Sequence, residues 1–379
     1  MGSDPDRYAG SLSGGIAGPL RPALPPRTFR SRADGGFVLA CAAMIAARTS
    51  RKRLGLAVGV LFAGLLVALL LAIALGVEPI DWASGAVWRP GTSEHAIVMS
   101  VRLGRALLGA VVGGALAAAG VTFQTLVRNP LADPYVLGVS SGASVGAALA
   151  IVAGAGQGAP LALGAFGGAL GALGLIYRLG VVRGRLVPHV VLLAGVVFNA
   201  FSWAVIVVLA SLSRPGTTAE MLIWLMGSLS APDWLRLGVA SVVVAIGLGA
   251  LIALAPRMNA LVLGDEGAHS LGVDVPRTRK LLLVTASVLT AAAVAMAGPI
   301  GFVGIIVPHV LRLIVGPDHR MLVPASALGG ALFLSTCDTL TRMSFLAIGS
   351  EPPVSVLTAL LGGPFFLVLL WQASDKRAT

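Results

Sequence analysis

Side chains that could bind a metal ion or carry out catalysis are rare in this sequence. Its two cysteines, Cys41 and Cys337, show no metal-ligand spacing. His309 follows a proline, but no second histidine, cysteine or carboxylate lies at a suitable spacing, so we expect it to pack against or cap a helix. The Gly-x-x-x-x-Gly-Lys-(Ser/Thr) sequence that holds the phosphates of ATP is absent. The sequence therefore predicts a chain that is not an enzyme and has no metal or other cofactor.

One polar segment, residues 257–280, could bind a partner or simply connect two apolar stretches. It mixes acidic and basic residues and is too polar to insert into a membrane. Within it, Leu263 to Leu271 could form a short helix, with Asp265 and Glu266 near the N-terminus, where the helix dipole favours anions. This pattern alone fits a solvated connector and a docking segment equally well.

Three arginines lie at the ends of long apolar stretches. Arg102 and Arg105 begin one stretch, and Arg342 ends another. Arginines in such places often reach lipid headgroups, and they can also bind acidic partners. Asp338 lies one helical turn before Arg342 and could hold its guanidinium group or simply neutralise it. Asn199 is an isolated amide in an apolar stretch, where it could line a channel or hydrogen-bond a neighbouring helix.

The composition predicts that the elements carrying these residues cross a membrane. Hydrophobic residues make up 56% of the 379 residues and charged residues only 11%, and the mean hydropathy is +0.92. A soluble domain has about 25% charged residues. Glycine, with 49 copies, lets membrane helices approach closely. The net charge of +11 could indicate nucleic acid, but the basic residues lie between apolar segments, so we expect a lipid bilayer and no nucleic acid as partner.

We expect an all-α, polytopic membrane bundle of about ten spans, each close to the roughly 20 residues that cross a bilayer. The spans lie near 54–77, 98–121, 136–154, 160–179, 189–212, 236–255, 281–298, 299–316, 322–343 and 354–372. Only Gly298-Pro299 separates the seventh from the eighth. Residues 1–53, which are basic and rich in Pro and Gly, are predicted to be a disordered tail, with Met44 as an alternative start. Residues 373–379 form the predicted C-terminal tail.

Basic residues predict the orientation of the spans. If the N-terminus is cytoplasmic, the inner ends and loops carry 16 of the 27 Lys and Arg residues. The outer side then carries six, namely Arg89, Arg102, Arg105, Arg214, Arg236 and Arg342. Because cytoplasmic loops of membrane proteins are enriched in Lys and Arg, this asymmetry favours a cytoplasmic N-terminus. An even number of spans then places both termini in the cytoplasm.

Several motifs occur in a fixed order along the apolar region. They are Asn-Pro-Leu-Ala-x-Pro from Asn129, Leu-Gly-x-Ser-x-Gly-Ala from Leu137, Leu-Ala-Gly-Val from Leu193, Trp-Leu-Met-Gly-Ser from Trp224, Gly-Asp-Glu-Gly-Ala from Gly264, Gly-Pro-Ile-Gly-Phe-Val-Gly from Gly298 and Gly-Gly-Pro-Phe-Phe from Gly362. The spacing of Gly138, Gly142 and Gly146 also predicts close helix packing. With these motifs, residues 54–372 resemble the FecCD/BtuC-like permease family of ABC importers for iron–siderophore complexes, haem or cobalamin.

The resemblance implies a type II ABC importer permease in a bacterial inner membrane. In that family, two permease copies form a pathway, two cytoplasmic ABC ATPase subunits hydrolyse ATP, and a periplasmic substrate-binding protein delivers the cargo. A single permease unit favours a homodimer. A ferric siderophore is the first expectation for the cargo, with cobalamin and haem as alternatives that the motifs do not separate.

The resemblance also assigns roles to individual residues. It implies binding-protein docking at Arg102, Arg105 and Arg342, an ATPase coupling loop with Gly264, Asp265, Glu266, Ala268, Leu271 and Gly272, and a cytoplasmic gate at Asn129 and Leu131. Asn199 joins the candidate pathway, with its alternative role in helix packing left open. Two positions differ from the family pattern: Gly104 replaces a proline between the docking arginines, and Pro188-His189 replaces a Thr-Ser pair, so no gating role is assigned to that pair.

An ion-coupled secondary transporter is the alternative from another class. Such carriers place charged or polar coupling residues near the middle of the membrane, often on broken helices in repeated halves. This sequence shows no repeated halves and few charges in the middle of its spans. The importer permease is therefore the favoured prediction.

Overall fold

Helices make up most of the described chain. The computed structural model describes residues 51–130, 132–156 and 158–378. The helices are α2 (Arg51–Ala74), α3 (Ser93–Ala96), α4 (Gly104–Val127), α5 (Val139–Val152), α6 (Ala159–Gly180), α7 (Pro188–Leu212), α8 (Pro215–Leu225), α9 (Trp234–Val262), α10 (Asp265–Ser270), α11 (Val275–Ala297), α12 (Val303–Val315), α13 (His319–Ile348) and α14 (Val354–Ala378). The described residues also include 3-10 turns at Trp82–Ser84 and Ala86–Trp88, a π-helix at Ile97–Leu103, and an antiparallel hairpin of β1 (Val181–Val182) and β2 (Arg185–Leu186).

The prediction of an all-α polytopic bundle is confirmed. Each of the ten predicted spans coincides with one helix, in the order α2, α4, α5, α6, α7, α9, α11, α12, α13 and α14. In the described part of the chain, seven helices are long and apolar enough to cross a membrane, while α5, α12 and the apolar part of α14 are shorter. The prediction misses α8, an 11-residue helix whose first half, Pro-Gly-Thr-Thr-Ala-Glu, contains no apolar run.

Helix boundaries differ from the prediction at both ends of the membrane region. α2 begins at Arg51, inside the predicted tail of residues 1–53, and α14 continues to Ala378, through the predicted tail of residues 373–379. Lys and Arg are good helix formers, so a helix can continue beyond its apolar section. The rest of the predicted N-terminal tail, including the alternative start at Met44, lies outside the described residues.

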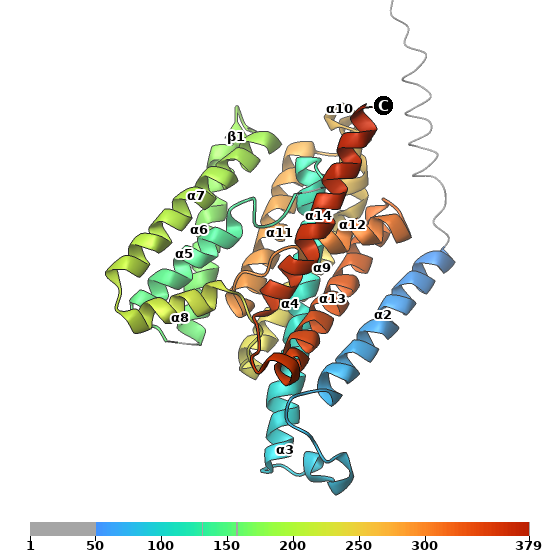
Figure 1. Ribbon diagram of the computed structural model, residues 1–379. Helices are drawn as coiled ribbons and strands as arrows, with labels where there is room; N and C mark the ends of the chain where they lie inside the picture. Colours follow the sequence, from blue (N-terminus) through green and yellow to red (C-terminus); the bar gives the residue numbers. More distant parts are fainter. Residues whose placement is uncertain (1–50, 131, 157, 379) are drawn as a thin grey trace, which may run out of the picture. The chain divides into compact units, whose positions relative to one another are not determined.

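Helix α4 is the centre of one group of helices and packs against α9, α11, α12 and α13 (Figure 1). Glycines bring these helices into backbone contact. A Cβ atom added to Gly113 would lie 2.2 Å from the carbonyl oxygen of Gly330 in α13, and one added to Gly120 would lie 2.1 Å from that of Gly304 in α12. No real Cβ atom fits at these distances, so both contacts require glycine.

Helices α5 to α8 form a second group with its own buried apolar cluster. The predicted glycine contacts join α5 to α6. A Cβ atom on Gly142 would lie 2.6 Å from the carbonyl oxygen of Gly168, and one on Gly146 would lie 2.1 Å from that of Gly164. The prediction of close packing is thus confirmed for these two glycines. The second group meets the first mainly through α11.

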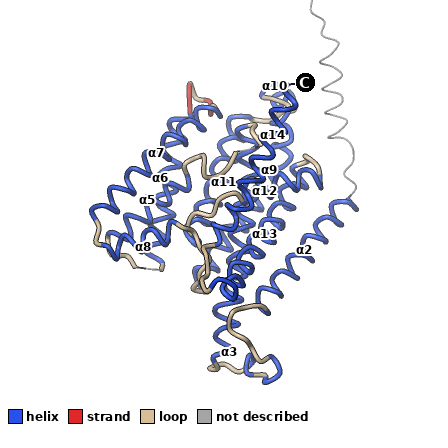
Figure 2. Tube along the Cα trace, in the orientation of Figure 1, coloured by secondary structure: helices blue, strands red, loops and turns tan. Residues whose placement is uncertain are grey.

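The two ends of the bundle carry different elements (Figures 1 and 2). One end, named here the α10 end, carries α10 and the β-hairpin. The opposite end, the α3 end, carries α3 and the turn of residues 349–353 between α13 and α14. α2 runs from the α10 end toward the α3 end, and α14 runs back, as an even number of spans requires.

Candidate functional site

The predicted short helix in the polar loop is α10, which is anchored on one side. Glycines flank it, with φ angles of 95° at Gly264 and 76° at Gly272, in the region that favours residues without a side chain. Ala268 is completely buried, whereas Glu266 and Leu271 are exposed. α10 and the residue that follows it therefore present the charged Glu266 and the apolar Leu271 to a partner from a fixed position.

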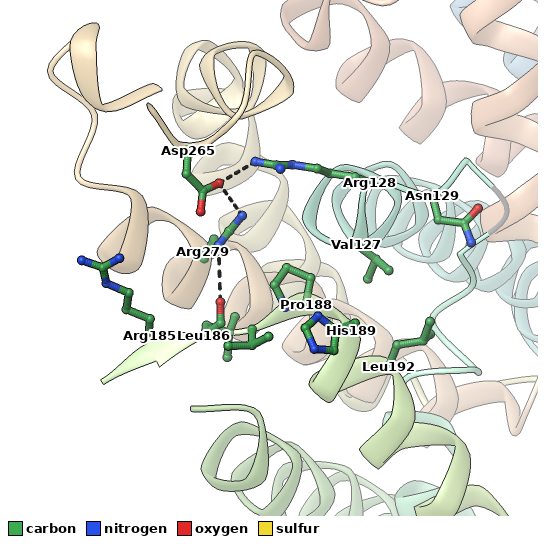
Figure 3. Close-up of a pocket in the computed structure, with 11 residues that line it drawn as sticks. Val127, Arg128, Asn129, Arg185, Leu186, Pro188, His189, Leu192, Asp265 and Arg279 are labelled. Carbon is green, nitrogen blue, oxygen red and sulfur yellow. Dashed lines mark hydrogen bonds and ion pairs between the residues drawn. The ribbon is translucent and has the colours of Figure 1, made fainter. Parts of the chain in front are cut away.

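The carboxylate of Asp265, at the start of α10, connects this helix to its neighbours (Figure 3). Its Oδ1 atom lies 2.5 Å from Nη2 of Arg128, which follows α4, and 2.7 Å from Nη2 of Arg279 in α11. Arg279 also donates a 3.4 Å hydrogen bond to the carbonyl of Leu186 in β2. The Arg279 side chain is buried, while those of Arg128 and Asp265 are about half exposed. The Asp265 carboxylate therefore links α10 to the end of α4 and to α11, and Arg279 extends this link to β2.

A cavity of about 520 Å³ lies beside this ion-pair cluster. Its lining includes Arg128 and Asn129 after α4, Pro188 and His189 at the start of α7, and the Asp265–Arg279 pair. The structure thus brings the predicted gate residue Asn129 and the predicted coupling residue Asp265 to one cavity. The Pro188-His189 pair, to which the sequence assigned no gating role, also lines this cavity.

The chain turns sharply after α4, ahead of the predicted gate. Arg128 has a φ of 55°, and its N–H donates to the carbonyl of Thr125. Leu131, the other predicted gate residue, lies outside the described residues. Asp133 is buried and accepts a 3.0 Å hydrogen bond from the N–H of Tyr135. Burial raises the pKa of Asp133 to about 6, and the hydrogen bonds from the backbone partly oppose this rise.

Asn199 joins two helices of the second group. Its side-chain NH₂ donates a 3.0 Å hydrogen bond to the carbonyl of Tyr135, and its Oδ1 accepts a 2.5 Å hydrogen bond from the hydroxyl of Ser141 in α5. These contacts match the alternative in which this amide hydrogen-bonds a neighbouring helix.

At the α3 end, two of the three predicted docking arginines are buried against the end of α2. Arg102 donates 3.0 Å hydrogen bonds to the carbonyls of Ile73 and Ala74, and another to that of Glu78. Arg342 donates a 3.0 Å hydrogen bond to the carbonyl of Ala72. The last carbonyls of a helix have no partner within the helix, and cations near them are favourable. These two arginines therefore cap the C-terminus of α2.

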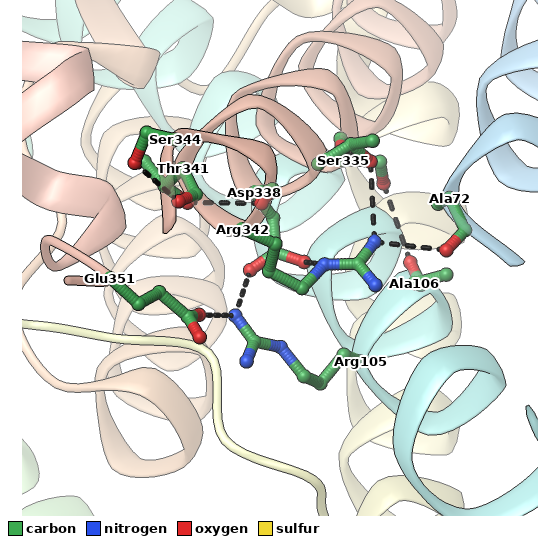
Figure 4. Close-up of polar contacts among 10 residues, drawn as sticks. Ala72, Arg105, Ala106, Ser335, Asp338, Thr341, Arg342, Ser344 and Glu351 are labelled. Carbon is green, nitrogen blue, oxygen red and sulfur yellow. Dashed lines mark hydrogen bonds and ion pairs between the residues drawn. The ribbon is translucent and has the colours of Figure 1, made fainter. Parts of the chain in front are cut away.

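The third docking candidate, Arg105, lies between two carboxylates (Figure 4). Its Nη2 atom is 2.6 Å from Oδ1 of Asp338 and 2.6 Å from Oε1 of Glu351. Asp338 also pairs with Arg342 at 3.2 Å, as the one-turn spacing of these residues suggests. The described cluster thus contains two arginines and two acids, and Glu351 is its most exposed member.

The residues excluded from metal binding take packing positions. His309 lies edge-on to Phe365, with ring centroids 5.7 Å apart. Cys337 is buried in α13, and Cys41 lies outside the described residues. Among the described residues, no three His, Cys, Asp or Glu side chains come together as a metal site requires.

Sequence analysis missed three residues of these clusters. Arg128 and Arg279 were counted there only among the 16 basic residues of the predicted inner ends and loops, and Glu351 was given no role. Their partners are 137, 14 and 246 residues away in the chain, so no local pattern identifies them.

Comparison with known proteins places the chain among transport proteins. It is 47% identical to a cobalamin import system permease protein of Halobacterium salinarum over 281 residues, which cover 74% of each chain. It is 41% identical to a hemin transport system permease protein of Yersinia pestis, over 84% of this chain and 97% of the relative. It is 40% identical to an Fe(3+) dicitrate transport system permease protein of Escherichia coli, over 79% of this chain and 93% of the relative.

Solved structures agree with this placement. A metal-chelate type ABC transporter in an inward-facing conformation matches with a TM-score of 0.73 and 30% identity, over 83% of this chain and 98% of that chain. The profile of the FecCD transport family matches residues 61–372, a range that begins within α2 and ends within α14. The chain therefore belongs to the FecCD transport family.

Proposed function

We propose that this chain is the membrane permease subunit of a binding-protein-dependent ABC importer that carries a metal chelate across a bacterial inner membrane. The observation that carries this proposal is the match of residues 61–372 to the FecCD transport family, with relatives named as cobalamin, hemin and ferric dicitrate permeases. The three named cargoes share one chemical class, a metal held in a bulky organic chelate. A ferric siderophore is the first cargo to test, with haem and cobalamin as the alternatives.

The proposed assembly contains two copies of this chain, two ATPase subunits and one binding protein. The absence of an ATP-binding motif in the sequence supports a separate ATPase. The exposed side chains of Glu266 on the anchored helix α10 and of Leu271 directly after it support this helix as the contact for that subunit. Both termini would then be cytoplasmic, which is also what the excess of basic residues at that side favours.

The α10 end supports a coupling mechanism. Closure of the ATPase dimer would push on α10, and the Asp265 carboxylate would transmit this movement to Arg128 and Arg279. Because Arg128 directly precedes Asn129, the push would reach the proposed gate through one peptide bond. A shift between outward-facing and inward-facing states would follow.

The α3 end is the proposed docking surface for the binding protein. Arg105 would contact a carboxylate of that protein directly. Arg102 and Arg342 would hold the end of α2 in place beneath the contact, since both donate to its backbone carbonyls. Acidic residues on the two lobes of the binding protein would face the two copies of this surface in the dimer.

Reconstitution tests the proposal against the secondary-transporter alternative. Proteoliposomes that contain this chain, the ATPase and the binding protein should take up a ferric chelate only when ATP is supplied. The chain alone should transport nothing under a proton or sodium gradient. Gradient-driven uptake by the chain alone would contradict the proposal and favour an ion-coupled carrier. Binding assays with ferric siderophore, haem and cobalamin on the binding protein would identify the cargo.

A further inference from the structure

One nitrogen of Arg105 is shared by two carboxylates that differ in accessibility (Figure 4). The Asp338 side chain is 1% exposed, whereas the Glu351 side chain is 38% exposed. Asp338 is also held by Arg342 on its own helix at 3.2 Å. Among the described residues, Arg105 is the one ion-pair partner of Glu351. Glu351 is therefore the carboxylate of this cluster that can be replaced.

The position of Glu351 makes its release easy. It lies in the turn of residues 349–353, which begins with Gly349 at a φ of 69° and ends with two prolines before α14. An ion pair with a partly exposed member contributes little to stability, because water competes with the contact. Leaving Arg105 would therefore cost Glu351 little, since its carboxylate would enter water.

Arg105 has unused capacity to bind a carboxylate. Both of its ion pairs involve the same nitrogen, Nη2. Its Nε atom is buried and has no hydrogen-bond acceptor in the described part of the chain. A guanidinium group binds a carboxylate best through two parallel hydrogen bonds, which a single nitrogen cannot supply. The present contact with Glu351 is thus weaker than one that an incoming carboxylate could form.

We propose that Glu351 is an internal substitute for a carboxylate of the binding protein. On docking, the partner's carboxylate takes Arg105, and Glu351 leaves with the turn of residues 349–353. This inference rests on the docking role proposed for Arg105. While Glu351 is bound to Arg105, the affinity of the permease for any partner is lowered. Only a partner that places its own carboxylate accurately on Arg105 displaces Glu351. Because the turn leads directly into α14, docking also frees the outer end of that helix.

Affinity measurements test this exchange. The complete complex of permease and ATPase, in nanodiscs of neutral lipid, is titrated with fluorescently labelled binding protein. Glu351→Gln removes the competing charge and should tighten binding by about three- to tenfold, because a larger fraction of the permease is then ready to bind. Arg105→Gln should weaken binding by about tenfold or more. In the double variant, Glu351→Gln should have no further effect, because the residue for which it competes is gone.

A matched control separates this effect from general electrostatics. Glu94 is a partly exposed acid at the same end; it accepts a hydrogen bond from the Ser93 hydroxyl and makes no ion pair among the described residues. Glu94→Gln should leave the affinity within about twofold of the original protein if only the competing acid matters. An equal gain from both variants would show that lowering negative charge anywhere on this end is sufficient, and would overturn the proposal.

The outcomes also distinguish this inference from the docking role on which it rests. If Arg105→Gln weakens binding but Glu351→Gln does not tighten it, the exchange is wrong and the docking role stands. If neither variant changes binding, both are wrong. If Arg105 matters only in nanodiscs with phosphatidylglycerol, it meets a lipid phosphate, and the exchange is again wrong. Hydrogen exchange gives a second readout, since the amides of residues 349–351 should exchange faster once the binding protein docks. No increase would contradict the release of the turn.

Discussion

Arg279 and Asp265 are 14 residues apart in the sequence, and Nη2 of Arg279 lies 2.7 Å from the same carboxylate oxygen that Arg128 contacts. This oxygen connects α10, the helix proposed to contact the ATPase, to α4 and α11. Its position makes the coupling step accessible to single substitutions.

Asp265→Asn should uncouple ATP hydrolysis from transport. The amide keeps the size of the side chain but loses the charge that holds both arginines. We expect uptake per ATP hydrolysed to fall by about fivefold or more, in the range of typical coupling energies. Asp274→Asn is the control, because Asp274 lies in the same loop and caps α11, and asparagine caps equally well. Unchanged uptake per ATP hydrolysed in Asp265→Asn proteoliposomes would show that the carboxylate has no role in coupling.

Gly264→Ala should also impair coupling. Gly264 has a φ of 95°, so a side chain there strains the backbone by about 1–2 kcal/mol and tilts α10. ATPase activity and uptake should be measured together, as for Asp265. Gly238→Ala serves as the control, because it lies in a regular helix with no atom within 4 Å of the new Cβ. Equal uptake per ATP hydrolysed in the two variants would argue against the requirement for a fixed position of α10.

Arg102→Gln should lower stability more than Arg105→Gln. Removing Arg102 leaves carbonyls at the end of α2 without a donor, at a cost of about 1–3 kcal/mol for each buried group. Arg105 makes one partly exposed ion pair, with Glu351, and its buried partner Asp338 keeps the ion pair with Arg342. The loss of Arg105 should therefore affect binding-protein affinity first. Thermal midpoints in detergent, measured beside binding-protein affinities, separate the two effects. If the Arg102→Gln protein is stable but binds the binding protein poorly, Arg102 contacts the binding protein directly.

Gly120→Ala should destabilise the bundle. The added Cβ atom would lie 2.1 Å from a backbone oxygen of α12, and the helices must separate to accommodate it. Overpacking of this kind costs about 1–3 kcal/mol. Gly171→Ala in α6 has open space and should be neutral or slightly stabilising, by up to about 1 kcal/mol. Comparable thermal midpoints for the two variants would contradict the close contact.

Asp133 should make stability depend on pH. Its pKa is about 6 in the folded chain, above the value of about 3.9 in an unfolded chain, so the folded chain holds the proton more tightly. The contribution of this group to stability is greatest below about pH 4 and is lost as the pH rises through 6. Asp133→Asn should therefore show a smaller fall in thermal midpoint between pH 4 and pH 7. Identical slopes for the two proteins would show that Asp133 does not titrate in this range.

The membrane bundle is predictable from the sequence because apolar length alone identifies a span. The break at Gly298-Pro299 was visible for the same reason, and the structure separates α11 from α12 there. α8 was not predictable, because the first half of its sequence is polar and shows no apolar run.

The candidate sites were predictable only in part. Family motifs identified Asp265 and the three outer arginines, but not their contacts. Arg102 caps a helix that ends 28 residues earlier, and Glu351 lies 246 residues from Arg105. Such contacts depend on which helices are neighbours, and the spacing of residues along the chain does not contain that information.

The glycine contacts of α4 have a consequence for how the permease changes shape. Where backbone meets backbone, no rotamer can change to absorb sliding, so Gly113 and Gly120 fasten α4 to α13 and α12. The same holds for Gly142 and Gly146 between α5 and α6. The unit of α4, α12 and α13 and the pair of α5 and α6 would then each turn as a unit, and α11, which contacts α4, α5 and α6, could serve as the pivot. Alternating access in this chain would then be a rotation of these two units about one helix.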